Sequence, residues 1–570
     1  MEKRVFLAIF LSFVVLGLYQ LLFAPPPLTP PAGPVEAGAP ATAAQAPGAT
    51  PPTPTIQQAA PSGATPLIGD AVARDIVVET EAIRAVFNTK GATLRSWQLK
   101  HYRERDGTPL ELVPSLGSGF DYPFTLATSD ATLSATLAAA LFKPSAESLS
   151  LGTATGTISF QYSDAAGLNA RKTFVFQPDG KPYIVNVEAA IDVQGTSLPV
   201  TLKFGPALHI GNDVGGPTHL PATALISRSG KVDRLSASAL ASEPRFEGQP
   251  KFVGVDEQYF LVATLPGSQA IKADFQPITV PGTDPAATPR TFIAYSVGTP
   301  GPGAASLAWF IGPKEFDILR AVDGEFVRAI DFGMFAWLVV PMLQGLKWLY
   351  GYIGNYGWSI VVLTILINLV LFPLRHRSMV SMRKMQSLQP EIKAIQDRYA
   401  KYKLTDPERQ KMNTEMMALY KQKGVNPASG CVPMLLTMPI LFAFYAMLQV
   451  AIELRGAPFF GWIHDLSLQD PTYIWPLLMG GTMFWQQKLM PASTDPTQAK
   501  ILMLMPIVFT VSFLWFPSGL VIYWLTSNLM AIAQQYLTNR IIGAPTVARV
   551  VRTSGPPKPN RTGAGQAGKP

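Results

Sequence analysis

Polar side chains inside apolar segments are the residues of this chain best suited to chemistry. Thr364 and Asn368 stand four residues apart in one apolar run, so a helix would carry them on one face. Singly, such residues are typical of hydrogen bonds between membrane helices. Together they favour a polar groove that could hydrate or hydrogen-bond a polar group at membrane depth. The others are Thr437, Gln449, Ser512, Thr526, Ser527, Asn528, Gln534 and Gln535.

The sequence gives little support to a covalent catalytic site or a metal site. Ser518 and His464 are the one pair that could serve a protease within the membrane, but both fall in predicted outer turns and no GxSxG motif accompanies them. The other histidines show no metal-ligand spacing, and no GxxxxGK[ST] phosphate loop occurs. We therefore expect neither an enzyme nor a bound cofactor or metal. These histidines are His101, His209, His219 and His376.

Five apolar segments must position the polar residues, and we expect each to be a membrane helix. Prolines fall in or beside several of them, which is tolerated where the backbone is buried or lines a wet cavity. The fourth segment would be about 24 Å long as a helix, against a hydrocarbon core of about 30 Å, so a thinned bilayer or a shielded position is expected. The segments are Tyr356–Leu374, Cys431–Leu454, Tyr473–Met490, Ile501–Phe516 and Gly519–Leu537.

The charge distribution predicts which ends of these helices face the cytoplasm. The chain has a formal net charge of +8, and its positive excess is confined to two stretches. Residues 375–423 hold twelve basic and five acidic residues, and the tail 538–570 holds six basic residues and no acid. Because cytoplasmic loops are enriched in Lys and Arg, both stretches are predicted to be cytoplasmic. The result is a multi-pass protein with both termini in the cytoplasm.

Two segments at the N-terminus precede any folded domain. Residues 1–23 begin with Met-Glu-Lys-Arg and continue as an apolar run without a small-residue cleavage site, which indicates an uncleaved transmembrane signal anchor. Residues 24–66 consist mainly of Pro, Ala, Thr and Gly and contain too few large apolar side chains to form a core. We expect a flexible linker there.

Residues 67–320 are predicted to form a large all-β domain. Short runs of alternating apolar and polar residues recur there, with turn signals between them. The clearest hairpin joins Lys172–Phe176 to Tyr183–Val187 across Pro178–Lys181. A β-sandwich on the outer side of the membrane, the periplasm, is the best interpretation.

Residues 321–355 are apolar and aromatic but are not counted as a span. Pro341 and Lys347 interrupt the apolar stretch Phe332–Ile353, and a span here would turn the basic stretch outward. We therefore expect an interfacial amphipathic helix. Its expected anchors are Trp337, Trp348, Tyr350 and Tyr352.

The basic stretch is predicted to form a cytoplasmic helical hairpin over residues 375–428. Methionines recur at helical spacing in both arms, Pro390 marks a kink or restart, and Asp406-Pro407 marks the cap and first turn of the second helix. Packing of one arm on the other explains these methionines, and their flexibility would also suit contact with varied apolar segments. The candidates are Met382, Met385, Met412 and Met416.

Several short sequence motifs follow one another in order across residues 354–540. They are Gly354-Asn355-Tyr356-Gly357-Trp358-Ser359-Ile360, Met416-Met417-Ala418-Leu419-Tyr420-Lys421, Val425-Asn426-Pro427, Gly430-Cys431-Val432-Pro433, Met438-Pro439-Ile440, Trp462-Ile463-His464-Asp465-Leu466 and Phe516-Pro517-Ser518-Gly519-Leu520. With these motifs the chain resembles the YidC family of membrane protein insertases, which is related to the Oxa and Alb insertases. The anchor, linker and β-domain resemble the long form of bacteria with two membranes.

This resemblance implies a periplasmic β-supersandwich and a five-helix insertase core over residues 356–537, in the bacterial inner membrane. It implies that the protein inserts newly made membrane proteins, and helps them to fold, through a hydrophilic groove open to the cytoplasm and the lipid. The implied partners are nascent membrane proteins, the lipid bilayer, the ribosome and the Sec translocon. The tail 538–570 could contact ribosomal RNA by neutralising phosphates, although orientation and lipid contact explain its charge equally well.

The resemblance also assigns residues to the groove. Thr364 matches a groove threonine, and Tyr523 and Trp524 match an aromatic pair opposite it. Leu441 matches an apolar position that contacts the substrate, and Ser512 replaces an aromatic residue. Asn368 stands where the family usually carries a basic residue, so this chain lacks a fixed positive charge at that position.

The charge at the groove and the function each have a second interpretation. Arg375 or Arg377 could supply the charge missing at Asn368, but their place just after Pro373 predicts that both lie at the level of the lipid headgroups. The alternative function is a polytopic transporter or channel with a polar site at the membrane midplane. A transporter of this kind is expected to contain inverted repeats, and the five apolar segments show no such internal symmetry.

Overall fold

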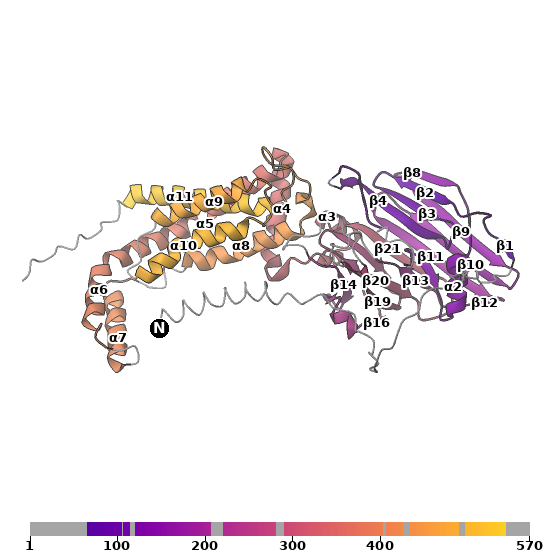
Figure 1. Cartoon of the computed structure of the whole chain (residues 1–570), viewed down its shortest axis with the longest axis horizontal. Coiled ribbons are helices and arrows are strands. Elements are labelled where there is room, and N and C mark those ends of the chain that lie inside the picture. The colour runs from indigo at the N-terminus through magenta and orange to yellow at the C-terminus, as the bar shows by residue number, and fades with distance from the viewer. Residues whose placement is uncertain are drawn as a thin grey trace, which may run out of the picture. The chain divides into compact units, whose positions relative to one another are not determined.

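The computed structural model describes residues 65–104, 106–113, 120–206, 220–280, 290–402, 406–425, 432–489 and 496–542. The expected anchor, the linker up to residue 64 and the tail beyond residue 542 lie outside this part, as does Cys431. Strands occur from Pro66 to Pro313, and helices dominate from Phe316 onward (Figure 1).

The largest sheet has eleven strands and contains the predicted hairpin. Strand β10 pairs with β11 in antiparallel register, with Phe176 opposite Val185, as the turn signal at Pro178–Lys181 predicted. The path is β1 (Pro66–Ile68), β9 (Gly156–Asp164), β10 (Leu168–Phe176), β11 (Ile184–Val193), β21 (Ala305–Pro313), β18 (Phe260–Leu265), β17 (Val253–Asp256), β14 (Thr223–Arg228) and β15 (Lys231–Ser236), with β12 (Thr196–Ser197) on β11 and β7 (Lys143–Pro144) on β9.

Two five-stranded sheets complete the β-domain. One runs β16 (Arg245–Gly248), β19 (Ile271–Val280), β20 (Arg290–Gly298), β13 (Thr201–Phe204) and β6 (Thr125–Ala127). The other runs β5 (Pro109–Glu111), β4 (Thr93–Arg103), β3 (Ile83–Asn88), β2 (Asp75–Thr80) and β8 (Ser148–Gly152). Pairing is antiparallel throughout these described strands except between β2 and β8.

Aromatic side chains join both small sheets to the large one. Trp309 of β21 packs against Phe204 and Tyr295 of the first small sheet, with ring centroids 5.5 and 5.6 Å away. Phe87 of β3 packs against Phe174 of β10 at 4.5 Å. Both small sheets therefore face one extended sheet, as expected for a supersandwich.

Short helices complete the β-region and connect it to the helical region. They are α2 (Ala131–Ala139), η1 (Ala239–Ala241), α3 (Phe316–Val322), η2 (Phe326–Ala329) and η3 (Gly333–Phe335).

The segment expected to be interfacial forms helix α4 (Ala336–Ile353). Its buried side carries Val339, Leu343 and Leu346, whereas Trp337 and Tyr352 are more than 70% exposed. Lys347 pairs with Glu315 at 3.0 Å, Asp317 at 2.5 Å and Glu453 at 3.3 Å. Burial opposes the charge of Lys347, but these carboxylates outweigh it and raise its pKa. The lysine that interrupts the apolar stretch is therefore neutralised by partners on one side of an amphipathic helix.

Each of the five predicted apolar segments contains a helix. The first helix differs from the prediction because it continues through Pro373 to Ser387 rather than ending at Leu374. A proline removes one backbone hydrogen bond, and packing on both sides can carry the helix past it. The helices are α5 (Tyr356–Ser387), α8 (Val432–Val450), α9 (Ile474–Leu489), α10 (Pro496–Phe513) and α11 (Ser518–Ile542), with η5 (Ile452–Leu454) after α8.

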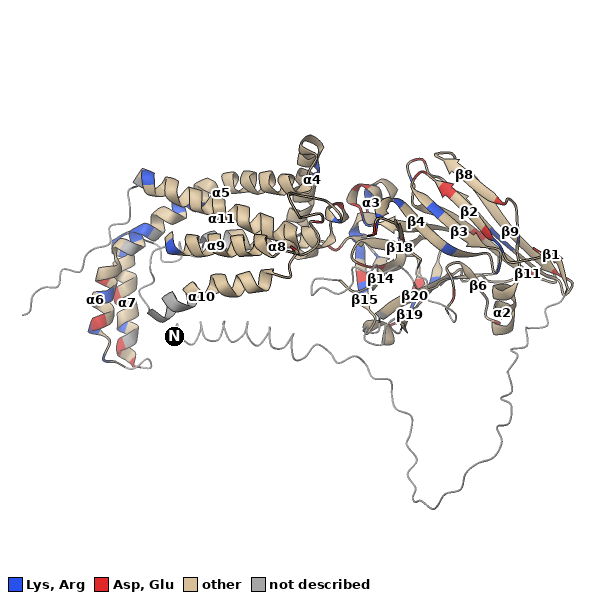
Figure 2. Ribbon diagram, turned by 45° about the horizontal axis from the view of Figure 1, so that its top comes forward, with Lys and Arg blue, Asp and Glu red and all other residues tan. Residues whose placement is uncertain are grey.

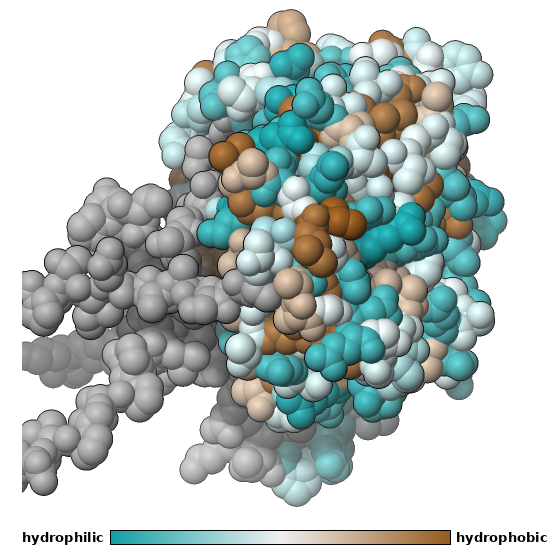
Figure 3. Space-filling model, turned by 90° about the vertical axis from the view of Figure 1, so that its right-hand side faces the viewer, coloured by the Kyte–Doolittle hydropathy of each residue, from teal (hydrophilic) through white to brown (hydrophobic). Residues whose placement is uncertain are grey.

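These helices expose apolar side chains to an extent that water-soluble domains rarely show. Examples are Val370 of α5, Leu477 of α9, Ile507 of α10 and Ile541 of α11, all at least 58% exposed. Charged residues gather instead on α6, α7 and the strands, while α8 to α11 carry few (Figure 2). The face of the β-domain seen in Figure 3 differs, with small separate hydrophobic patches among polar residues.

By length and composition, one described helix could cross a membrane, at Tyr356–Met385. Two shorter apolar helices lie at Thr437–Val450 and Met503–Phe513. Polar residues lower the hydropathy of α11, and α9 has only sixteen residues.

Residues 388–425 belong to a compact unit of their own and form two helices. Helix α6 (Gln389–Arg398) carries Pro390 in its first turn, and α7 (Pro407–Gln422) begins at the cap Asp406, which accepts a hydrogen bond from the Glu408 backbone. The restart and the cap are both as predicted. The hydroxyl of Tyr399 donates to Glu415 at 2.7 Å and joins the two arms.

Close packing of α9 on α10 depends on Gly480, which gives a first prediction. A Cβ atom at Gly480 would collide with the side chain of Thr510, whereas nothing lies within 4 Å of the same position at Gly481. Gly480→Val is therefore expected to destabilise the helical region by about 1–3 kcal/mol, and Gly481→Val to change stability much less. Thermal unfolding of the purified full chain in detergent measures both; equal losses would contradict the packing argument.

Candidate functional site

Three side chains of α5 form a continuous hydrogen-bonded row, which we name the polar ladder. Thr364 donates to the carbonyl of Ile360 at 2.7 Å, and Asn368 Nδ2 donates to the carbonyl of Thr364 at 2.7 Å. Arg375 Nη1 donates to Asn368 Oδ1 at 2.6 Å. Thr364 is fully buried and Asn368 is 6% exposed. The guanidinium of Arg375 therefore contacts the buried end of this polar row.

Helix α11 lies beside α5 and places Tyr523 near the ladder. Tyr523 is buried, stacks on Phe444 of α8 with ring centroids 4.0 Å apart, and lies near Arg375. Phe444 shares one face of α8 with Thr437 and Leu441, since the spacings are seven and three residues. The structure therefore brings Thr364, Asn368 and Tyr523 together, with the Leu441 face of α8 beside Tyr523.

Two predicted groove residues lie elsewhere. Trp524 packs on Phe509 and Phe513 of α10, with centroids 5.7 and 4.9 Å away. Ser512 is exposed, and its hydroxyl donates to the carbonyl of Val508 in the same helix. Neither side chain joins the polar ladder.

Several of the other polar residues join helices in the ordinary way. Asn528 of α11 donates to Thr482 of α9 at 3.2 Å, and Gln535 donates to the carbonyl of Leu489 at 3.3 Å. Gln534 donates to the carbonyl of Phe372 on α5. For these residues the interpretation as hydrogen bonds between helices is correct, which leaves Asn368 and Arg375 as the unusual pair.

The headgroup level expected for Arg375 stays a prediction, and the structure adds the direction of its side chain. Its side chain is part-buried and turns back along α5 to Asn368, because side chains in a helix point toward the N-terminal end. Arg377, two residues on, is exposed. The sequence signal was available, since a spacing of seven residues puts Asn368 and Arg375 on one helix face. Phe444 was missed, although it follows Leu441 by three residues.

The loop between α8 and α9 packs against the start of α11. Ser518 donates its hydroxyl to the carbonyl of Leu468 at 2.8 Å, and its backbone N–H donates to the same atom. Ser518 is fully buried, His464 is exposed, and among the described residues no hydrogen bond joins them. Ser518 is therefore a structural link, and this region gives no support to a protease.

Asp470 organises the same loop from a fully buried position. Its Oδ1 accepts hydrogen bonds from the Trp462 indole and from the backbone and hydroxyl of Thr472, and its Oδ2 accepts from the Trp475 backbone. Burial opposes ionisation, but these donors outweigh it and lower the pKa of Asp470. The carboxylate thus fixes Trp462 to the beginning of α9.

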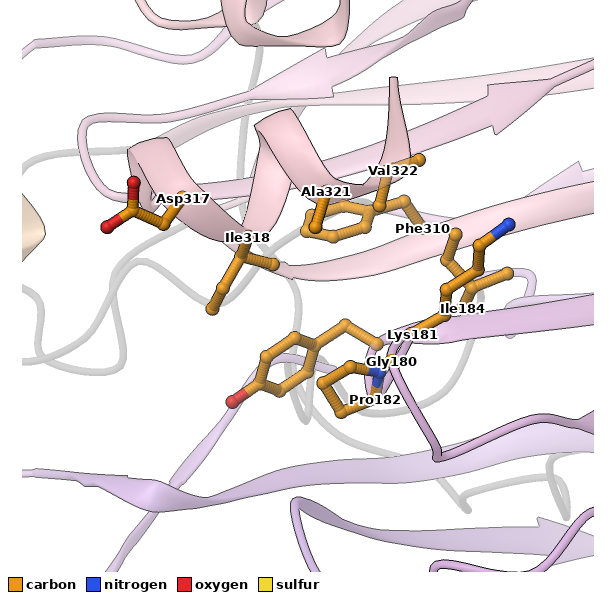
Figure 4. Close-up of a pocket in the computed structure, with 10 residues that line it drawn as sticks. Gly180, Lys181, Pro182, Ile184, Phe310, Asp317, Ile318, Ala321 and Val322 are labelled. Atoms are coloured by element: carbon orange, nitrogen blue, oxygen red, sulfur yellow. The ribbon is translucent and has the colours of Figure 1, made fainter. Parts of the chain in front are cut away.

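A small hollow in the β-domain is a weak candidate for a ligand site. It lies between the β10–β11 turn and α3 and encloses about 230 Å³, below the usual range of small-molecule pockets (Figure 4). Lys181 and Pro182 lie on one side and Ile318 on the other. Asp317 is the one carboxylate of its lining, and it pairs with Lys347. The hollow holds no pair of carboxylates for sugar chemistry.

The structure describes only some of the methionines that the sequence assigned to the helical hairpin. Met412 is buried in the hairpin unit, which agrees with packing between the arms. Met416 is part-buried on α7, and Met385 is part-buried on the extended α5. The side chain of Met382 lies outside the described residues.

Comparison with known proteins identifies the family. Residues 348–544 match the 60Kd inner membrane protein family, and residues 75–344 match the YidC periplasmic domain. A membrane protein insertase YidC of Geotalea daltonii is 36% identical over 95% of this chain and 100% of its own length. This chain belongs to the YidC family of membrane protein insertases. The insertase YidC of Syntrophus aciditrophicus is 34% identical over the same shares.

The resemblance seen in the sequence is thereby confirmed. The protein is a membrane protein insertase with a YidC-like fold and a large periplasmic β-sandwich domain. A crystal structure of an active YidC insertase with its first transmembrane domain resolved is 18% identical, with a TM-score of 0.35, and the match covers 83% of this chain and 95% of that one.

Proposed function

We propose that α5, α8, α9, α10 and α11 cross the inner membrane and pass the polar flank of a nascent protein along the polar ladder. One observation carries this proposal: α5 buries its polar side and exposes its apolar side. Thr364 and Asn368 are buried, whereas Leu369 and Val370 are 53% and 77% exposed. A helix in water has the opposite arrangement, so lipid is the natural neighbour of the exposed side.

The proposed orientation places both termini in the cytoplasm, with the β-sandwich in the periplasm. Its support is the charge pattern, because residues 375–423 and the tail 538–570 carry the positive excess. Helix α4 then lies along the periplasmic interface, where exposed Trp337 and Tyr352 suit the headgroup region.

The ladder would lower the barrier for moving a polar flank into the bilayer. A charged or polar group costs several kcal/mol in hydrocarbon, and side chains that hydrogen-bond it on the way reduce that cost. Burial of the incoming apolar helix, at about 25 cal/mol per Å² of apolar area, supplies the driving force. No nucleotide is required for such a step.

Two partners follow from the basic cytoplasmic segments and from family membership. The hairpin and the tail would approach the ribosome by neutralising phosphate, and binding would weaken with salt. The Sec translocon would share substrates whose loops are too large for the ladder alone. Deleting residues 543–570 is expected to weaken ribosome binding and to flatten its dependence on salt, measured by co-sedimentation; unchanged binding would exclude the tail as the contact.

Insertion itself tests the main proposal. Cells depleted of their own insertase and carrying this chain are expected to insert a small single-span substrate, scored by protease access to its translocated tail. Asn368→Leu should slow insertion about tenfold or more, because Arg375 and the Thr364 carbonyl lose their partner. Leu369→Ile, on the exposed side of the same helix, is the matched control. If the intact chain fails to insert the substrate despite stable expression, the transporter or channel alternative gains instead.

A further inference from the structure

The turn between β17 and β18 connects the β-sandwich to the end of α8, within one compact unit of the chain. Gln258 Nε2 donates to the carbonyl of Gln449 at 2.8 Å. After η5, Arg455 Nη1 donates to the carbonyl of Arg103 at 3.2 Å, and Arg455 Nη2 lies 3.6 Å from Glu104 Oε2. We name this set of contacts the joint, and it consists of residues 103–104, 256–260 and 449–455.

The joint encloses the carboxyl group of Glu257, which is 7% exposed. Within the described part of the chain, no hydrogen bond or ion pair reaches this carboxyl group. A buried carboxyl group without such partners is costly to ionise. The charged and titratable groups that face it are Asp256 beside it, Tyr259 in the same turn, Glu104 after β4, Lys314 after β21 and Arg455 after η5.

The charges around Glu257 are already balanced without it. Lys314 Nζ lies 2.8 Å from Asp256 Oδ2, and Arg455 lies 3.6 Å from Glu104. Each of these cations therefore has a carboxylate beside it, and an ionised Glu257 would add a third negative charge to two positive ones. Burial outweighs the attraction of Lys314 and Arg455 and raises the pKa of Glu257 to about 8.

We propose that Glu257 makes the joint sensitive to protons, so that the joint is tight while this carboxyl group is neutral and loosens when it ionises. Opening the joint gives the carboxyl group access to water, to which it releases its proton. The contact between the periplasmic sandwich and the insertase helices is thereby coupled to the pH of the periplasm. This property is separate from the insertion step, and its test needs no substrate.

Rising pH is expected to weaken the joint, because the closed state holds a proton that the open state releases. In the open joint Glu257 has its ordinary pKa, about 4.3, and in the closed joint the pKa is about 8. Between these values, each unit of rising pH favours opening by up to about tenfold. The joint is therefore tightest in acid, loosens progressively up to about pH 8 and changes little above it.

Hydrogen exchange of the purified full chain in detergent, from about pH 5 to about pH 9, tests this proposal. Exchange in residues 449–455 and 252–262 is compared at each pH with that of Glu257→Gln, whose side chain stays neutral, so the intrinsic pH dependence of exchange cancels. From pH 5 to pH 8 the rate of the intact chain relative to the variant is expected to rise about tenfold or more in both segments, and little further by pH 9.

Two further variants serve as the control and as a test of the contacts. Glu247→Gln changes an exposed carboxylate of the same sandwich, paired with Lys272, and should leave both segments unchanged at every pH. Arg455→Gln removes contacts across the joint and should speed exchange in residues 449–455 at every pH, whereas Arg455→Lys, which keeps the charge, should restore part of the protection.

Three results would overturn the proposal. A rate ratio that stays constant from pH 5 to pH 8 would show that Glu257 does not control the joint. A rise confined to residues 252–262 would place the titration inside the sandwich alone. Unchanged exchange in Arg455→Gln would show that these contacts do not hold the joint closed.

Discussion

Replacing Lys314 by methionine is expected to lower the free energy of unfolding of the β-sandwich by about 3–5 kcal/mol. Lys314 Nζ lies 2.8 Å from Asp256 Oδ2, and the two side chains are 4% and 8% exposed. Removing the ammonium leaves the Asp256 carboxylate buried, with the Thr223 hydroxyl, 2.6 Å away, as its other side-chain partner among the described residues. Guanidinium unfolding of the full chain in detergent, followed by tryptophan fluorescence, measures the loss.

Two variants show whether the buried charge is the cause. Lys314→Met combined with Asp256→Leu removes both charges and should recover much of the lost stability, because no unpaired charge stays behind. Lys272→Met breaks the exposed pair with Glu247, 3.4 Å apart, and should cost less than about 1 kcal/mol. A double variant as unstable as Lys314→Met would show that packing, rather than charge, dominates.

Replacing Asp470 by alanine is the second large effect, with an expected loss of about 3 kcal/mol in the stability of the helical region. The Trp462 indole and the Trp475 backbone N–H each donate a hydrogen bond to the Asp470 carboxylate at 2.8 Å. The substitution removes the acceptor of both bonds. Asp465→Ala in the same loop is the control, since the Asp465 carboxylate accepts hydrogen bonds from the backbone and hydroxyl of nearby Ser467. Thermal unfolding in detergent compares them, and equal losses would refute the role of Asp470.

The lowered pKa of Asp470 gives this effect a pH dependence of known sign. A carboxyl group whose pKa is lower in the folded state stabilises the fold above its unfolded pKa, about 3.9, and loses that contribution as the pH falls through its folded pKa. The stability difference between the intact chain and Asp470→Asn should therefore be constant from pH 7 to about pH 5 and shrink below about pH 4. A difference that grows on acidification would contradict this assignment.

Local sequence determined much of the fold because its signals act over a few residues. Alternation and the turn at Pro178–Lys181 fixed the β10–β11 hairpin and its register. The cap Asp406 and the restart at Pro390 located helices α7 and α6. Several long words of sequence in the right order also sufficed to identify the insertase family, which the comparisons confirmed.

The end of α5 could not be read in the same way. Pro373 and the basic residues after it suggested that the helix stops at Leu374, yet it continues to Ser387. A proline weakens a helix locally, but contacts from α11 at Phe372 and His376 support α5 on either side of it. Such contacts join residues about 160 positions apart, and no local pattern reports them.

The candidate site was likewise predictable only in part. By itself the sequence determined that Thr364 and Asn368 share a helix face and that basic residues follow them, because helical periodicity is local. Only the tertiary structure decided that Arg375 turns inward to Asn368, that Tyr523 stacks on Phe444 and that Trp524 and Ser512 lie apart from them. The shared helix face makes the contact between Arg375 and Asn368 possible. The direction that a long charged side chain takes also depends on the groups around it, and those of α8 and α11 come from distant parts of the chain.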